Sequence, residues 1–374
     1  MSRRLLLVTN DFPPRQGGIQ SFLYELTRRL PADQVAVYSS NYPGAEAFDA
    51  QLSFPVRRHP TGLLLPSPAA RRRVLQARQD FGATSIWFGA AAPLGLLAAP
   101  LRAAGARRLV ATTHGHEVGW AMLPGARQAL RRIADGVDVL TYLGDYTRRR
   151  LVAALGQRTE LAQLTPGVDV DTFNPAVSGE PVRRRYGLTG RPVLVCVSRL
   201  VPRKGQDVLI RALPAIREQV PEAALLIVGG GPYDKQLRRL AERAGVTEQV
   251  IFTGPVPFAE LPGHFAAGDV FAVPCRTRRF GLDVEGLGMV FLEASATGLA
   301  VLAGDSGGAP DAVLAGRTGE VVDGSDVAAV AARLALLLTE PGRAAELGAA
   351  GRAWVEQAWR WDTIADRLAE LLQL

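Results

Sequence analysis

Short apolar runs rich in Val, Ile, Leu and Ala recur along the whole chain, and stretches of helical composition separate them. This alternation is typical of an α/β fold with doubly wound parallel sheets, in which helices cover both faces of each sheet. Because a chain of 374 residues is too long to fold around a single hydrophobic core, we expect two such sheets in tandem. The strands are predicted at 5–9, 34–39, 85–88, 109–113, 138–142 and 160–164, and at 193–197, 224–228, 250–253, 270–273, 299–303 and 320–322.

The segment 165–175 contains Pro, Gly and Asx residues without hydrophobic periodicity, so it is predicted to link the two halves. We expect a first domain over residues 1–166, a second over 167–358, and a helix over 359–374 that packs back on the first domain. Ligands of such folds bind at the carboxyl ends of the strands, so the substrate cleft should lie between the domains. Asp169-Val-Asp171 matches a metal-binding Asp-x-Asp string but falls in this linker, so we expect no metal role for it.

The stretch 285–298 is predicted to be a glycine loop that turns into a helix near Met289. The first turn of that helix leaves backbone N–H groups without partners, which together with the helix dipole suits a phosphate. The carboxylates of Glu285 and Glu293 would repel a phosphate, so they fit beside it only if each faces hydroxyl groups of a ligand. An ordinary helix with a surface Glu at each end fits the spacing equally well. The amides concerned belong to Gly288, Met289, Val290 and Phe291.

Two further strand ends carry residues suited to anions. Gly17 and Gly18 follow the first strand and open a helix, which makes either a second backbone cradle for an anion or a plain tight turn. Arg199 and Lys204 follow the strand 193–197 at the start of another helix. Cations are unfavourable there because they oppose the helix dipole, so their presence indicates a functional role. A guanidinium and an ammonium together suit the two phosphates of a nucleoside diphosphate, and a solvated loop is the alternative.

The histidines give no metal signal. His114, His116 and Glu117 follow a predicted strand, but they lack the i, i+4 spacing of a helical zinc site. We therefore expect no metal. One of these two histidines should face the cleft as a hydrogen-bond donor and the other should pack. His59 and His264 are expected at the surface.

Positive charge is concentrated in one half: residues 1–165 contain 21 Arg, no Lys and 11 acidic residues. Such asymmetry indicates an anionic partner, either nucleic acid or an anionic membrane surface, unless it reflects a coding bias toward Arg. An anionic membrane surface is favoured over nucleic acid, because no aromatic stacking platform accompanies the arginines. The arginines at 71–73, 78, 131–132 and 148–150 fall on predicted helices, with Trp120, Met122 and Leu123 in a loop between them.

No segment is expected to span a bilayer. The longest charge-free apolar run, 86–101, is interrupted by Pro93 and Pro100. The apolar residues after the N-terminal Met-Ser-Arg-Arg predict a first strand rather than a signal peptide. Cys196 and Cys275 stand far apart without metal-ligand spacing, so we expect reduced thiols in a cytoplasmic protein.

Taken together, these motifs resemble glycosyltransferase family 4, whose members are retaining enzymes with two Rossmann-like domains facing across a cleft, the GT-B fold. The resemblance implies a nucleotide-sugar donor and no metal cofactor. It also implies that Arg199 and Lys204 hold the diphosphate and that Glu293 holds the ribose hydroxyls. The matching segments are Gly17-Gly18, Thr113-His114-Gly115, Gly167-Val-Asp169, Ser198-Arg199-Leu200 with Lys204-Gly205, Val228-Gly-Gly-Gly-Pro232, and Glu285 with Glu293.

The same resemblance assigns Glu285, with the amides of 288–291, to the donor sugar and phosphates, and Val256 to the base. His114 would donate to a sugar hydroxyl near the anomeric centre, and Gly18 would close over the phosphates. Retention in this family is described as front-face attack, in which the leaving phosphate oxygen takes the proton of the acceptor. No dedicated nucleophile is therefore expected.

The first hypothesis is a mannosyltransferase that moves mannose from GDP-mannose to a lipid head-group acceptor, such as phosphatidylinositol monomannoside, at the inner face of the cytoplasmic membrane. A UDP-sugar donor with another glycolipid or a small soluble acceptor is the alternative within the family. An inactive sugar-nucleotide-binding regulator is disfavoured by the presence of Arg199, Lys204 and Glu285. An NAD-dependent oxidoreductase would need a Gly-x-Gly-x-x-Gly fingerprint with an acidic partner, which the sequence lacks.

Overall fold

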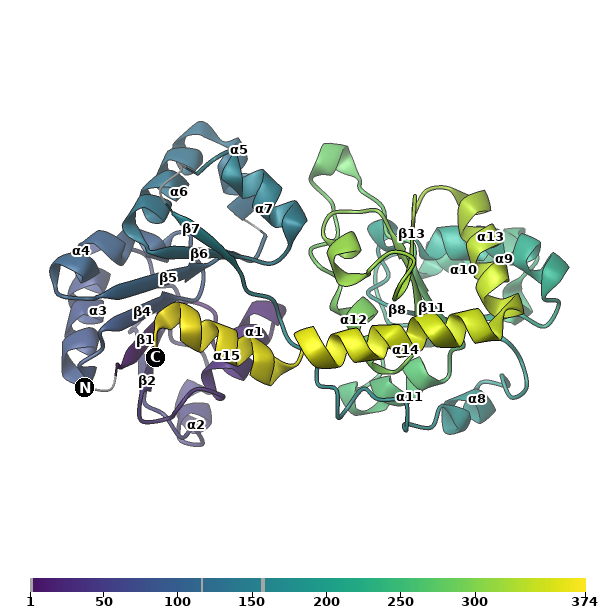
Figure 1. Ribbon diagram of the computed structural model, residues 1–374, viewed down its shortest axis with the longest axis horizontal. Helices are drawn as coiled ribbons and strands as arrows, with labels where there is room; N and C mark the ends of the chain where they lie inside the picture. Colours follow the sequence, from purple (N-terminus) through teal and green to yellow (C-terminus); the bar gives the residue numbers. More distant parts are fainter. Residues whose placement is uncertain (1–2, 116, 156–158) are drawn as a thin grey trace. The chain divides into compact units, whose positions relative to one another are not determined.

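The computed structural model describes residues 3–115, 117–155 and 159–374, and the chain divides into two compact units. The first unit comprises Met1–Gly167 and Trp361–Leu374, and the second comprises Val168–Arg360 (Figure 1). The chain therefore leaves the first unit once, after Gly167, and returns to it at Trp361.

The first unit is built on a sheet that has seven strands within the described residues, all paired in parallel. This confirms the predicted α/β class. The order β3-β2-β1-β4-β5-β6-β7 reverses direction between β1 and β4, and the carboxyl ends of strands at such a switch point form a natural ligand site. The strands are β1 (Leu5–Thr9), β2 (Val35–Ser39), β3 (Val56–Arg58), β4 (Ser85–Phe88), β5 (Arg108–Thr112), β6 (Val139–Tyr142) and β7 (Glu160–Gln163).

The edge strand β3 is not predicted by the sequence. It contains one apolar residue, Val56, beside two arginines, so no apolar run marks it. Its pairing with β2 brings the following His59 against Tyr38, and the Oη of Tyr38 shares a 2.8 Å hydrogen bond with His59 Nδ1. His59 is therefore buried, and the expectation that it lies at the surface is wrong.

The C-terminal helix α15 (Trp361–Leu372) packs against α1 (Gly18–Thr27) and against β4 and β5 of the first unit. Its apolar face, which includes Leu368, is buried, and the Oγ of Ser85 donates to the carbonyl of Leu372 at 3.0 Å. The other helices are α2 (Ala45–Asp49), α3 (Pro68–Phe81), η1 (Leu94–Leu97), α4 (Ala98–Ala103), α5 (Glu117–Met122), α6 (Pro124–Gly136) and α7 (Asp145–Val152).

The loop expected around Trp120, Met122 and Leu123 contains the short helix α5 instead. The carboxylate of Glu117, the first residue of α5, accepts the backbone N–H of His114 at 2.9 Å. Local capping of this kind is difficult to foresee in a short segment without apolar periodicity. Leu123 follows α5 and is 63% exposed.

The second unit is built on a sheet of six parallel strands in the order β10-β9-β8-β11-β12-β13. The order reverses between β8 and β11, so the loops that follow these two strands lie at the switch point. The strands are β8 (Val193–Val197), β9 (Ala224–Val228), β10 (Val250–Gly254), β11 (Val270–Val273), β12 (Ala300–Gly304) and β13 (Gly319–Val322).

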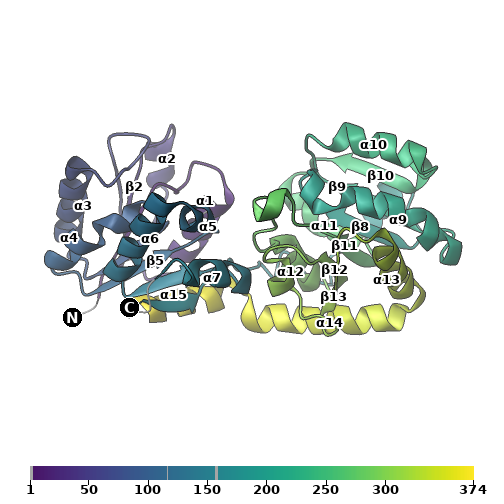
Figure 2. The ribbon, with the colours of Figure 1, turned by 90° about the horizontal axis from the view of Figure 1, so that it is seen from above.

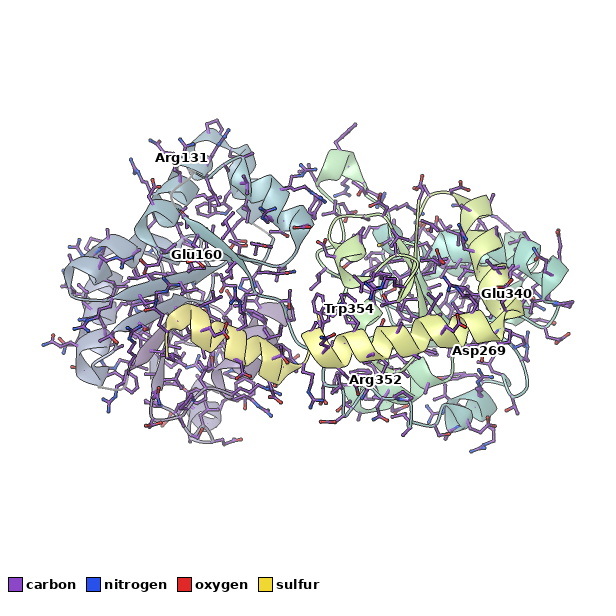
Figure 3. The ribbon with its side chains drawn as sticks, viewed as in Figure 1. Arg131, Glu160, Asp269, Glu340, Arg352 and Trp354 are labelled. Atoms are coloured by element: carbon purple, nitrogen blue, oxygen red, sulfur yellow. The ribbon has the colours of Figure 1, made fainter. Side chains whose placement is uncertain are left out.

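The long helix α14 (Pro341–Ala358) runs along the second unit and packs against α12 (Met289–Ala296) and β12 (Figure 2). Arg352 on α14 (Figure 3) donates through Nη1 to the carbonyls of Val170, Phe173 and Ala296, at 2.9, 2.8 and 2.8 Å. This guanidinium ties the segment after Val168 to α12. The other helices are α8 (Glu180–Arg185), η2 (Pro202–Lys204), α9 (Gln206–Gln219), α10 (Asp234–Arg243), η3 (Thr247–Gln249), η4 (Phe258–Glu260), α11 (Leu261–Ala266), η5 (Arg279–Gly281), η6 (Ala309–Ala312) and α13 (Val327–Thr339).

His264 is buried on α11, where its Nδ1–H donates to the carbonyl of Glu260 at 2.7 Å. The expectation that His264 lies at the surface is wrong, because this face of a short helix packs inward. Asp169 closes a turn: its Oδ1 accepts the N–H groups of Asp171 and Thr172 at 3.1 and 3.0 Å. This geometry explains the Asp-x-Asp string as a structural turn.

Two kinds of feature are absent from the described residues. None of the helices in the described parts of the chain is long and apolar enough to cross a bilayer. In the same residues, no group of three or more His, Cys, Asp and Glu side chains is arranged to hold a metal ion.

Candidate active site

The candidate site of the second unit begins at the turn after β8. Gly205, at φ 76°, joins η2 to α9, and a Cβ at this position would lie 2.0 Å from the carbonyl oxygen of Pro274. Only glycine therefore fits here, because both the backbone conformation and the close approach exclude a side chain. The preceding Lys204 is held at the switch point of the sheet with 8% of its surface exposed.

Lys204 pairs with Glu285 in this turn. The Nζ of Lys204 lies 2.7 Å from the Oε2 of Glu285, and Glu285 is 6% exposed. Arg203 adds a second cation, with its Nε 3.9 Å from the same carboxylate oxygen. Two residues that the sequence assigned to separate parts of a ligand thus contact each other, 81 positions apart in the chain. A bound diphosphate would have to share Lys204 with this carboxylate.

The backbone around Glu285 is fixed by the loop after β12. The N–H of Gly308 donates to the carbonyl of Glu285 at 2.9 Å, and the N–H of Glu285 donates to the Oγ of Ser306 at 3.4 Å. Gly307 has φ 58°, and a Cβ there would lie 2.1 Å from the carbonyl oxygen of Glu285. Ser306 was missed by the sequence analysis, because only the fold brings it to this loop.

Helix α12 begins at Met289, as predicted. Gly288 stands before it at φ 80°, where a Cβ would meet the ring of Phe291 at 2.5 Å. The N–H of Phe291 already donates to the carbonyl of Gly288 at 3.0 Å. The amide of Phe291 is therefore not available to a bound anion. The backbone N–H groups that remain for the predicted anion site are those of Gly288, Met289 and Val290.

Glu293 lies one turn further along α12 and is partly buried. Burial raises the pKa of its carboxyl from 4.5 to about 7, and the charge of nearby Lys204 partly offsets this rise. Near neutral pH the carboxyl is therefore divided between its two protonation states. In either state it can hydrogen-bond hydroxyl groups.

A pocket of about 350 Å³ lies at the carboxyl ends of β8, β9 and β10. It brings together Arg199 and Val256, which the sequence analysis assigned to the diphosphate and the base. Gly229 lines this pocket, and a Cβ at this position would lie 2.2 Å from the carbonyl oxygen of Ser198. The lining residues are Val197, Ser198, Arg199, Val228, Gly229, Gly230, Pro255, Val256 and Leu261.

Gln206 and Asp207 support this site but were not foreseen. The Nε2 of Gln206 donates to the Oγ of Ser198 at 2.8 Å and to the carbonyl of Arg199 at 3.0 Å, which fixes the loop that carries Arg199. The buried carboxylate of Asp207 accepts two bonds from Arg276, at 2.9 and 3.1 Å. Both residues open α9, directly after Lys204-Gly205, and that adjacency is the only signal the sequence offered.

In the first unit, Gly17 precedes α1 and makes a close approach to the first turn of the helix. A Cβ on Gly17 would lie 2.2 Å from the Oε1 of Gln20, whose Nε2 donates to the Oδ1 of Asp11 at 2.7 Å. A Cβ on Gly18 would meet nothing within 4 Å. The backbone at Gly18 is therefore accessible to a ligand.

His114 lies at the carboxyl end of β5, also in the first unit. Its Nε2–H donates to the carbonyl of Gly89 at 2.6 Å, and the ring of Phe22 meets it edge-on at 5.4 Å. The imidazole is thus fixed in position at the end of the sheet. His116, the other histidine of the motif, lies outside the described residues.

Comparison with protein families shows two matches that together cover most of the chain. A model of Glycosyltransferase Family 4 matches residues 16–172, and a model of Glycosyl transferases group 1 matches residues 180–354. Among solved structures, Anabaena HepE in complex with UDP has a TM-score of 0.81 at 20% identity, over 99% of both chains. WaaG, a glycosyltransferase involved in lipopolysaccharide biosynthesis, has a TM-score of 0.64 at 20% identity, over 98% of this chain and 99% of its own. These likenesses show that the fold is shared.

Full-length relatives are more closely similar in sequence. The GDP-mannose-dependent alpha-(1-6)-phosphatidylinositol monomannoside mannosyltransferase of Mycolicibacterium smegmatis is 55% identical over 98% of both chains. The GDP-mannose-dependent monoacylated alpha-(1-6)-phosphatidylinositol monomannoside mannosyltransferase of Corynebacterium glutamicum is 48% identical over 100% of this chain and 98% of its own.

The Lys204–Glu285 pair predicts a strong energetic coupling. Lys204→Met or Glu285→Gln alone should lower the free energy of unfolding by about 3–5 kcal/mol, because each leaves a buried charge without its nearest partner. The double variant should lose less than the sum of the two single losses, by about 1–3 kcal/mol. Urea unfolding measures all three. Lys235→Met, at the only other lysine and on an exposed surface, is the matched control, and additive losses would contradict the pairing.

Glu293 predicts a pH dependence of stability. Its folded pKa of about 7 lies above the ordinary value of 4.5, so the folded state is favoured below pH 4.5 and loses stability as pH rises to about 7. Relative to Glu293→Gln, the protein should lose about 3 kcal/mol across that window, and the loss should level off above it. Urea unfolding between pH 4.5 and 8 tests this, with Glu218→Gln on the exposed face of α9 as control. A difference that does not vary with pH rejects the raised pKa.

Proposed function

The chain belongs to glycosyltransferase family 4, and on that premise we propose that it transfers mannose from GDP-mannose to a lipid acceptor of the phosphatidylinositol monomannoside type. The observation that carries the proposal is 55% identity over 98% of the chain to a relative with that donor and acceptor in its name. The positions of Lys204 and Arg199 support it, because a buried ammonium and a guanidinium at the carboxyl ends of the strands suit a nucleoside diphosphate.

We assign the donor nucleotide to the second unit. The base would lie near Val256 in the 350 Å³ pocket, and Arg199 would contact the diphosphate from the same pocket. Lys204 would neutralise the charge that develops on the leaving phosphate, which is the largest electrostatic demand of the reaction. Glu293 would accept from or donate to the ribose hydroxyls, and Glu285 would hold the donor sugar.

The proposed step needs no protein nucleophile. The bond between the anomeric carbon and the phosphate oxygen breaks, and the acceptor oxygen bonds to the same face of that carbon. The proton of the acceptor hydroxyl passes to the departing phosphate oxygen, so charge and atoms balance without a metal. We assign the acceptor to the first unit, where the backbone of Gly18 is exposed and the ring of His114 is fixed at the carboxyl end of β5.

We further propose that the protein works as a peripheral protein at the inner face of the cytoplasmic membrane. Three clusters of exposed arginines on the first unit support this: Arg71–Arg73 on α3, Arg131 (Figure 3) with Arg132 on α6, and Arg148–Arg150 on α7. Each exposed cation near an anionic membrane surface contributes about 1 kcal/mol of attraction. Leu123, which lies between the first and second of these clusters in the sequence, is exposed and adds an apolar side chain to this surface.

Isothermal titration with GDP, UDP and their mannose and glucose conjugates tests the donor. GDP and GDP-mannose should bind at least about tenfold more tightly than their UDP counterparts, and Arg199→Ala should weaken GDP binding by about 1.5–3 kcal/mol through loss of a charged hydrogen bond. Arg333→Ala, an exposed arginine on α13, is the control. Tighter binding of UDP would overturn the mannose assignment, and binding of neither nucleotide would overturn the proposed function.

A further inference from the structure

The loop between β11 and α12 carries the most exposed large apolar side chain of the described residues. Phe280 is fully exposed and Leu282 is 69% exposed, in a segment that leads directly to Glu285. Figure 1 draws the short turn η5, which contains Phe280, as a green element that projects from the second unit. Large apolar side chains that are exposed next to each other on one loop indicate an interaction site.

The backbone holds Phe280 in an outward position at a conformational cost. Arg279 and Phe280 have φ values of 51° and 55°, and Gly281 follows at 90°. Left-handed conformations are unfavourable for residues with a side chain, and they persist where the surroundings impose them, often at functional sites. Here the turn is closed by backbone bonds from Gly281 and Leu282 to the carbonyls of Arg278 and Arg279, at 3.1 Å each.

The base of the loop is fixed to the candidate active site. Arg278 and Asp283 form an antiparallel bridge, with a 3.5 Å ion pair between their side chains. Asp283 also lies 3.8 Å from the Nη1 of Arg203, whose Nε faces Glu285 at 3.9 Å. The projecting tip is therefore anchored to the same network that holds Lys204.

The tip is basic as well as apolar. Residues 276–283 contain three arginines and one aspartate, a net charge of +2. Arg276 and Arg278 are paired with carboxylates, whereas Arg279 is exposed next to Phe280. An aromatic and an aliphatic side chain beside an exposed cation match the interface of an anionic bilayer, where apolar groups enter the acyl boundary and cations meet phosphates.

We propose that Phe280 and Leu282 insert into the interface of an anionic lipid bilayer, with Arg279 at the lipid phosphates. This gives the second unit a membrane contact of its own, next to the residues assigned to the donor. The inference rests on the proposed function, because a lipid acceptor requires the site to work at a bilayer. A second copy of this chain is a poorer partner for the loop, because the chain carries a net charge of +7 and two basic loops would repel each other.

Single-site labelling tests the insertion directly. Cys196 and Cys275 are buried, and burial raises the pKa values of their thiols to about 11 and about 12, so a thiol introduced at the surface is labelled selectively. Phe280→Cys and the matched Phe258→Cys, at another exposed phenylalanine of the second unit, each receive an environment-sensitive fluorophore. Vesicles of phosphatidylinositol with phosphatidylcholine should shift the emission at position 280 to the blue, and that at position 258 should not change. Equal responses at both positions, or none at position 280 while the protein sediments with vesicles, overturn the proposal.

A functional assay separates this proposal from the proposed function. The variant Phe280→Ser/Leu282→Ser should bind the same vesicles about tenfold more weakly, because it loses the apolar area that enters the interface. Its GDP affinity and its mannose transfer to a deacylated, water-soluble head group should match those of the parent. Unchanged vesicle affinity in this variant, with loss of binding in Arg71→Glu/Arg72→Glu/Arg73→Glu, would place membrane contact on the first unit alone and reject the inference. Failure of the parent to bind GDP would instead reject the proposed function. Insertion of the loop would then be decided by the labelling experiment at position 280 alone.

Discussion

Two opposite charges that are costly to bury alone hold the site of the second unit together. Lys204 and Glu285 come from loops 81 positions apart, and each is almost excluded from water. Removing either partner would leave a charge in a medium of low dielectric, so the pair requires both loops to keep their positions. Glycines make that possible: Gly205 lets the first loop pass against Pro274, and Gly307 lets the loop after β12 pass against the backbone of Glu285.

The same pair connects structure with the proposed chemistry. A diphosphate bound as proposed would replace part of the role of Glu285 as the anion next to Lys204, so the cation would already be positioned before charge builds on the leaving group. Preorganised charge of this kind is effective in catalysis because little reorganisation is needed during the reaction. Arg203 extends the network to Asp283 and thereby to the base of the loop that carries Phe280. The proposed donor site and the proposed membrane contact thus share one set of ion pairs.

Much of this architecture was predictable, because it depends on local patterns. Alternating apolar runs predicted the strands other than β3 to within a residue or two at most ends, and glycines at 286 and 288 predicted the start of α12 at Met289. What the sequence could not give depends on contacts between distant segments. His59 is buried because β3 pairs with β2, and β3 could not be predicted because it contains only one apolar residue. Ser306 and Gln206 reach the site only because loops that are distant in sequence pack together. The roles assigned to Arg199, Lys204, Glu285 and Glu293 remain proposals.

The rate of mannose transfer by Lys204→Ala tests the central claim most directly. With GDP-mannose and a lipid acceptor supplied at saturating concentrations, release of GDP should fall about 100-fold or more, because a preorganised charge at the leaving group is lost. Lys235→Ala, which removes the only other lysine of the chain, should turn over like the parent. Release of GDP from Lys204→Ala at the rate of the parent would contradict the claim that this ammonium assists the departure of the nucleotide.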